Sequence, residues 1–139
     1  MANIRQQIID ALETRMNTIA DVEKVVVWRA SDLSPDELPA IIIRDTIDTM
    51  PADGVGAGRL DHELDVSLTA MFAGNTSASD SREMVATIVA SIGEDSTFGG
   101  LAYDTILLSA DLDLDDSAQL IAAAQITLTI RYRSGMWSI

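Results

Sequence analysis

The sequence predicts an α+β fold, in which two helices pack on one face of a single, mainly antiparallel sheet. Two long alternating segments lead to this fold class. The segment 60–72 places Leu64, Val66 and Leu68 at every second position, with polar residues between them. Alternation with a period of two is typical of a strand that has one buried face. The segment 120–133 alternates in the same way, so two such strands are expected at the centre of the sheet.

The two alternating segments also predict their own pairing. In an antiparallel arrangement with Glu63 opposite Arg131, Asp61 falls opposite Arg133, and the apolar positions of one strand face those of the other. Opposite charges across a strand pair are favourable, whereas a shift of one residue would turn every apolar side chain outward. One register therefore satisfies the charges and the buried face together.

The remaining elements are predicted in order along the chain. Apolar residues at helical spacing indicate a first helix that runs to about Asn17, with Asn3 as its N-cap. Strands are expected at 24–29 and 40–46, which are rich in Val and Ile. Trp28 follows three valines and is expected in the core.

A second helix is predicted from about Ser81 to Ile92. Asp80 and Glu83 have the spacing of a capping box, and Gly93 is expected to end the helix. A strand at 103–112 follows and turns into the last long strand.

The element order is therefore α-β-β-β-α-β-β. If the two long strands pair, the strand after the second helix lies parallel to the first long strand, with the last strand between them. This split β-α-β unit gives the predicted sheet order 1-2-3-5-4. Both helices are expected on the apolar face of the long strands, which leaves the opposite face polar.

Composition limits the function classes. A length of 139 residues and a 47% share of hydrophobic residues indicate one domain, 1–139, with a real core. The net charge of −13 disfavours binding to nucleic acid or anionic membrane, because both are bound through Lys and Arg. The absence of cysteine excludes disulfides and thiolate metal sites. No signal peptide or membrane-spanning run is recognised, so assembly in the cytoplasm is expected.

Three stretches contain residue types that can carry chemistry. The glycine-rich loop 54–58 precedes a strand and lacks Lys-Ser/Thr, so it is interpreted as a connection, not a phosphate cradle. The acidic run 111–116 lacks the Gly and Glu positions of a calcium loop. His62 is interpreted as a histidine at the rim of the apolar face, with no Ser, Cys or carboxylate beside it. We therefore predict that the chain has no catalytic, cofactor-binding or metal-binding residues and that it is not an enzyme.

Several stretches together resemble the tail terminator (tail completion, minor tail protein U-like) proteins of long-tailed bacteriophages. They are the opening amphipathic helix, L-P-A-I-I-I-R-D at 38–45, the glycine-rich loop and L-D-V-S-L-T-A-M-F at 64–72. They continue with G-G-L-A-Y-D-T-I-L-L-S-A-D at 99–111 and A-Q-I-T-L-T-I-R-Y-R at 124–133. The resemblance spans nearly the whole chain and lies in the order of these segments, since no single motif among them is diagnostic.

The resemblance implies a virion protein that forms a ring, typically of six subunits, at the head-proximal end of the tail. Such a ring caps the tail tube, stops its growth and meets the head completion or connector protein. The expected partners are therefore further copies of the chain, the tube protein and the connector. The alternatives are another head–tail joining or tube protein, and, from a different class, a small metal-binding or ligand-binding module that uses the acidic run.

The connection 49–59 is the predicted assembly contact, because a long loop rich in glycine is costly to order without a partner. We expect it to be mobile in an isolated subunit and ordered against a neighbour. The candidate contact residues are Asp53, Gly54, Gly56, Gly58, Arg59 and, in the C-terminal tail, Trp137.

Overall fold

The fold is a single sheet with two helices on one side. A computed structural model of the chain describes residues 3–20, 22–28, 38–51, 55–56, 58–73, 77–115 and 121–135. The elements are α1 (Ile4–Asn17), β1 (Lys24–Val27), β2 (Ala40–Thr49), β3 (Val55–Gly56), β4 (Arg59–Ala73), α2 (Ser77–Glu94), β5 (Asp104–Asp115) and β6 (Ile121–Gly135).

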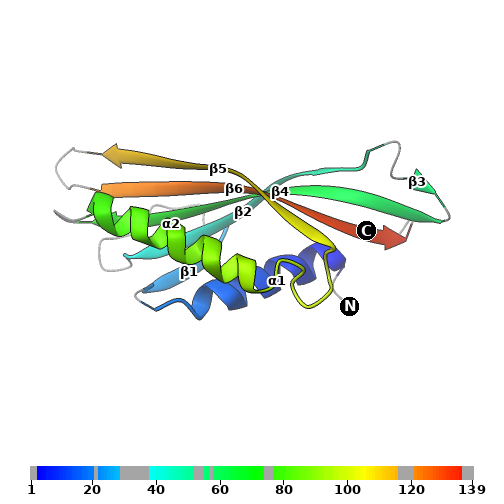
Figure 1. Ribbon diagram of the computed structural model, residues 1–139, viewed down its shortest axis with the longest axis horizontal. Coiled ribbons are helices and arrows are strands. Elements are labelled where there is room, and N and C mark those ends of the chain that lie inside the picture. Colours follow the sequence, from blue (N-terminus) through cyan, green and yellow to red (C-terminus); the bar gives the residue numbers. More distant parts are fainter. Residues whose placement is uncertain are drawn as a thin grey trace.

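The sheet has the predicted topology. Its strand order is β1-β2-β4-β6-β5, and the short β3 pairs with β4 outside this path. This is the predicted order 1-2-3-5-4, with the split β-α-β unit formed by β4, α2 and β5 around β6. All neighbouring pairs are antiparallel except β1 and β2, which run parallel, so the sheet is mixed. Both helices lie on the same side of it (Figure 1).

The predicted register of the two long strands is confirmed. Glu63 lies opposite Arg131, and Asp61 lies opposite Arg133. Arg133 donates from Nε to Asp61 Oδ1 at 2.8 Å. Arg131, however, forms its ion pair with Asp104 of β5, at 3.3 Å between nitrogen and oxygen. On the face of the sheet opposite the helices, the ion pairs therefore link side chains of three strands, β4, β6 and β5.

The core lies between the sheet and the helices, as the alternation predicted. Its fully buried members come from both helices and from every long strand except β5; they include Ile8, Leu12, Ile43, Leu64, Leu68, Ile88, Ile126 and Ile130. Arg15 joins the two helices, because its guanidinium donates to the backbone oxygens of Ser91 and Asp95 at 2.9 and 3.1 Å near the end of α2. Cations are stabilising at this end of a helix, where backbone carbonyls lack partners. None of the helices in the described part of the chain is long and apolar enough to cross a membrane.

The first helix matches its prediction, including the cap: Asn3 accepts a hydrogen bond from the backbone of Gln6 at 2.8 Å. The second helix is longer than predicted. It begins at Ser77, so Asp80 lies in its first turn and is not the cap, and it continues through Gly93 to Glu94. The acidic side chain of Asp80 still suits the positive end of the helix dipole.

Several strand boundaries differ from the prediction, including the end of β6, which continues past residue 133 to Gly135. β1 stops at Val27, and the next residue, Trp28, has a left-handed backbone (φ 52°) and is 54% exposed, so its expected place in the core is wrong. β2 continues past residue 46 to Thr49. β5 continues to Asp115, so the acidic run predicted as a hairpin end is largely part of a regular strand.

One end of the sheet projects beyond α1 (Figure 1). There β3 folds back on the start of β4, with Val55 opposite Leu60 and Gly56 opposite Arg59. Gly58 adopts φ +76° in this turn, a conformation that favours glycine. Part of the predicted loop 49–59 is therefore a tight hairpin.

Candidate functional site

A buried polar cluster joins β2, β4 and β6 near the start of α1. The His62 imidazole contacts Asp48 Oδ1 through Nδ1 at 3.0 Å and Ser134 Oγ through Nε2 at 2.7 Å. The Tyr132 hydroxyl donates to the other carboxylate oxygen of Asp48. The Tyr132 ring also stacks on the imidazole, with centroids 4.3 Å apart and an angle of 10° between the ring planes.

This cluster corrects the interpretation of His62. The sequence placed His62 at the rim of the apolar face without a polar partner, whereas its side chain is fully buried and both ring nitrogens are paired. The partners come from two strands that were predicted to end earlier. Asp48 lies in the extension of β2, and Ser134 lies in the extension of β6.

The order of contacts, Ser134–His62–Asp48, is that of a serine hydrolase triad. A carboxylate can only accept, so Nδ1 carries a hydrogen. A neutral imidazole then accepts at Nε2, where it shares the Ser134 hydroxyl hydrogen with the backbone oxygen of Gly135, 3.1 Å from Ser134 Oγ. However, His62 has no exposed surface and Ser134 is buried as well. A nucleophile without access to solvent cannot attack a bound substrate. The arrangement is therefore suited to holding three strands together, because every buried polar group in it has a partner.

A second carboxylate extends the cluster to the surface. Asp45 accepts from Arg5 Nε at 2.7 Å and from the Trp28 indole N–H. The Arg5 guanidinium also lies 3.9 Å from Asp48. Burial raises the pKa of Asp45, but hydrogen bonds from Trp28 and Arg5 outweigh this effect and hold the pKa below its ordinary value. The indole of Trp28 is thus fixed on the surface by a partly buried carboxylate.

Tyr132 is predicted to stay protonated in alkali until the protein unfolds. Burial, and then its hydrogen bond to the Asp48 carboxylate, raise the pKa of Tyr132 well above 10.0. The folded state thus keeps a proton that the unfolded state releases, so this stabilisation is present below pH 10 and is lost as the pH rises further. The Tyr103→Phe variant leaves Tyr132 as the remaining tyrosine of two.

In that variant, ultraviolet phenolate absorbance should rise only together with the loss of circular dichroism. Protein unfolded in guanidinium is the control and should titrate near the ordinary phenol value. A reversible ionisation near pH 10 with an unchanged fold would show that the Tyr132 hydroxyl is not held by Asp48.

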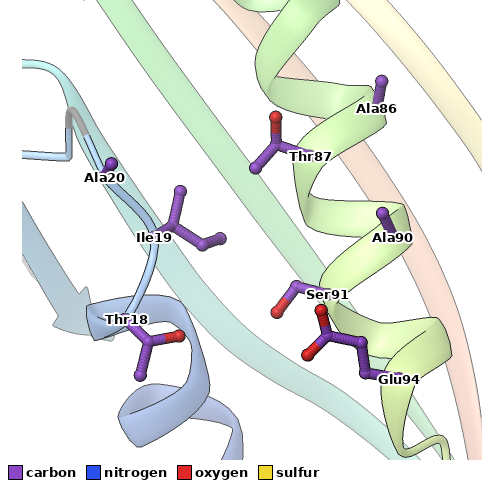
Figure 2. Close-up of a pocket in the computed structure, with 8 residues that line it drawn as sticks. All are labelled: Thr18, Ile19, Ala20, Ala86, Thr87, Ala90, Ser91 and Glu94. Carbon is purple, nitrogen blue, oxygen red and sulfur yellow. The ribbon is translucent and has the colours of Figure 1, made fainter.

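A groove of about 500 Å³ separates the end of α1 from α2. Figure 2 shows Thr87, Ser91 and Glu94 on the side of α2 that is turned toward Thr18 and Ile19. The hydroxyls of Thr18 and Thr87 donate to backbone oxygens of their own helix, at 2.6 and 3.0 Å. Glu94 is the one titratable side chain among the lining residues, so the groove offers no pair of groups for acid–base chemistry.

The edge strand β5 carries the largest group of exposed apolar side chains. Among the described residues only β6 pairs with it, so the outer backbone groups of β5 are left open. A register shift between Leu107 and Ser109 marks a bulge, and Leu108 within it is 57% exposed. The exposed apolar side chains of this edge are Ile106, Leu107, Leu108 and Leu112.

Apolar hollows continue this surface onto α2. One of about 160 Å³ is lined by Val89, Ile92 and Leu107 among others. A second, of about 170 Å³, is lined in part by Val85 and Leu112. We call β5 and these hollows the β5 surface. Several exposed apolar side chains gathered along one edge are typical of a surface that a partner covers.

The predicted contact residues are only partly placed. Gly56 lies in β3, Gly58 is the turn residue, and Arg59 begins β4 with an exposed side chain. Asp53, Gly54 and Trp137 lie outside the described residues. Within the described ranges no group of three His, Asp or Glu side chains is placed to hold a metal ion.

Comparisons with known proteins assign no family to this chain. No protein-family model matches the chain, and no curated protein matches it. Among solved structures, one similar chain comes from the "Virion of native gene transfer agent (GTA) particle". The TM-score is 0.42 and the sequence identity 11%, over 95% of this chain and 92% of that chain. A similarity this weak assigns no function to the chain.

Proposed function

We propose that this chain is a non-enzymatic structural protein of a phage-like virion, and that its role is that of a tail terminator. In this role, copies of the chain form a ring that caps the tail tube, stops its growth and offers a surface to the head connector. The observation that carries the proposal is the β5 surface: a long edge strand whose apolar side chains face solvent in the single subunit.

An open apolar edge is a liability for a protein that stays monomeric. Such edges pair with other chains unless charge, proline or a covering element blocks them. β5 has a bulge at Leu108 and four Asp, but its stretch 105–110 carries no charge and no proline, and no other described element covers this edge. Assembly with further copies would remove this area from water, so a subunit of a larger particle accounts for it.

Two features of the sequence support the finer role. The pattern of segments that resembles the tail terminator family coincides with α1, β2, β4, β5 and β6. The net charge of −13 suits a ring whose channel lets DNA pass without holding it. A metal-binding or ligand-binding module, by contrast, would not account for the exposed apolar side chains of the β5 surface.

The test is the state of assembly of the purified chain. We expect light scattering and electron microscopy to show closed rings in equilibrium with monomer. The Leu108→Asp variant should be monomeric, with the ring fraction lowered at least tenfold, because assembly would bury an unpaired charge in an apolar contact. Its circular dichroism and Tm should match those of the wild type, since Leu108 is exposed.

Ala86→Asp is the matched control, because it adds the same charge at an exposed position of α2 that lines neither of the two hollows of the β5 surface. This variant should form rings normally. Open tubes of indefinite length would favour a tube protein instead of a terminator. A wild-type chain that stays monomeric at all concentrations, and with tail tubes present, would contradict the proposed function.

A further inference from the structure

We infer that the subunits join head to tail, with the β5 surface of one copy seated on the outer edge of β2, residues 44–49, in the next copy. This inference rests on the proposed function and names the two surfaces of its ring contact. It uses a second open edge of the sheet, on the side opposite β5.

The second edge exists because β1 is short. β1 pairs with β2 from Ala40 to Ile43, and its last residue, Val27, lies opposite Ile43. β2 continues to Thr49, but among the described residues no strand lies along the outer side of this extension. We call the segment 44–49 the β2 edge.

The β2 edge is apolar where it is exposed. Ile47 is 59% exposed, the largest exposed fraction among the big apolar side chains described, and Met50 follows at the end of the strand. Trp28 borders the same edge, because its backbone N–H donates to the oxygen of Ile43 at 3.0 Å. Its indole is fixed by Asp45. A rigid exposed tryptophan beside aliphatic side chains is typical of a contact region.

The charges of the two edges are complementary. β5 contains four Asp and no Lys or Arg, and three of the four Asp lie outside the ion pair that Asp104 forms with Arg131 of β6. Within the β2 edge, Arg44 forms no ion pair with any described residue. The two acidic residues of β2 itself, Asp45 and Asp48, are paired with Arg5, Trp28, His62 and Tyr132. The β5 surface should therefore attract the β2 edge and repel a second β5 surface.

The placement of the edges decides the type of assembly. Two different surfaces on opposite edges of one sheet make a heterologous contact, which closes into a ring when the rotation between subunits allows it. A contact between two β5 surfaces would instead be isologous and would stop at a dimer. The second arrangement also brings like charges together, which is costly.

The experiment is a mixing test with two variants, each blocked on one edge. Leu108→Asp blocks the β5 surface, and Ile47→Asp blocks the β2 edge. Each variant alone should be monomeric, because every copy lacks one half of the contact. An equimolar mixture should give dimers and nothing larger, since one intact β5 surface and one intact β2 edge remain in each pair. The Ala86→Asp variant should assemble like the wild type.

The outcomes separate the two proposals. Rings formed by Ile47→Asp, or a mixture that stays monomeric, would overturn the head-to-tail contact while leaving wild-type rings and the proposed function intact. A wild-type chain without rings would overturn the proposed function itself. Arg44→Glu should also lower the ring fraction, whereas Arg44→Lys should preserve it. Equal ring fractions in these two variants would contradict the charge pairing between the edges.

Discussion

Replacing Asp48 with alanine is expected to lower the free energy of unfolding by about 3–5 kcal/mol. The Asp48 carboxylate accepts from His62 and from Tyr132, and both partners are buried. Without it, two donors would remain in the protein interior with no acceptor, and each such group costs about 1–3 kcal/mol. Urea unfolding followed by circular dichroism at neutral pH measures the loss, and Tm should fall by about 10 °C.

Two further variants isolate the cause of this loss. Asp61→Ala removes a carboxylate from the more exposed pair with Arg133 and should cost less than about 1 kcal/mol. In the double variant Asp48→Ala, Tyr132→Phe, one of the two orphaned donors is gone. It should therefore be more stable than Asp48→Ala alone. A double variant that is less stable would show that the Tyr132 hydroxyl has another partner.

The pairing of the central strands could be predicted from the sequence because two independent signals agree there. The apolar alternation and the charges of Asp61, Glu63, Arg131 and Arg133 select one register, and a slip would expose the core. The sheet order followed from that pair and from short connections. The ion pair between Arg131 and Asp104 could not be found in this way, since it depends on how β5 aligns with β6 across a bulge.

The buried cluster was missed for a physical reason that lies in β2. Simple alternation places residues 45 and 48 on opposite faces. The register shift between Asp45 and Asp48 adds one residue, so both carboxylates reach the side of the sheet that faces α1. A bulge leaves little trace in a sequence. Ser134, by contrast, could have been found by continuing the alternation of β6 two residues beyond Tyr132.

The two proposed contact edges depend on where strands end, which is the least certain part of any reading of a sequence. Trp28 belongs to a valine-rich run and was expected inside, but β1 stops before it. That early stop leaves the β2 edge without a neighbouring strand among the described residues. The predicted contact loop lies at the projecting end of the sheet, and its described part, around Gly56 and Arg59, folds as a hairpin on β4.

Leu68→Ala is expected to destabilise the subunit by about 2–5 kcal/mol. Leu68 has no exposed surface and lies on the central strand between Ile43 of β2 and Ile126 of β6, which are also fully buried. The side chain is therefore enclosed by strands on both sides, so the surroundings cannot easily collapse into the space that it leaves. The loss then includes both the transfer of the missing methyl groups and the cavity that remains.

Thr69→Ala is the matched control for this prediction, because it truncates the next residue of the same strand on the open face. Its backbone pairing is unchanged and it leaves no cavity in the core, so its unfolding free energy should stay within about 0.5 kcal/mol of the wild type. Urea unfolding of both variants measures the contrast. Equal stabilities for Leu68→Ala and Thr69→Ala would mean that the helices do not pack on this face of the sheet. In that case the open face of the sheet would have to be assigned anew.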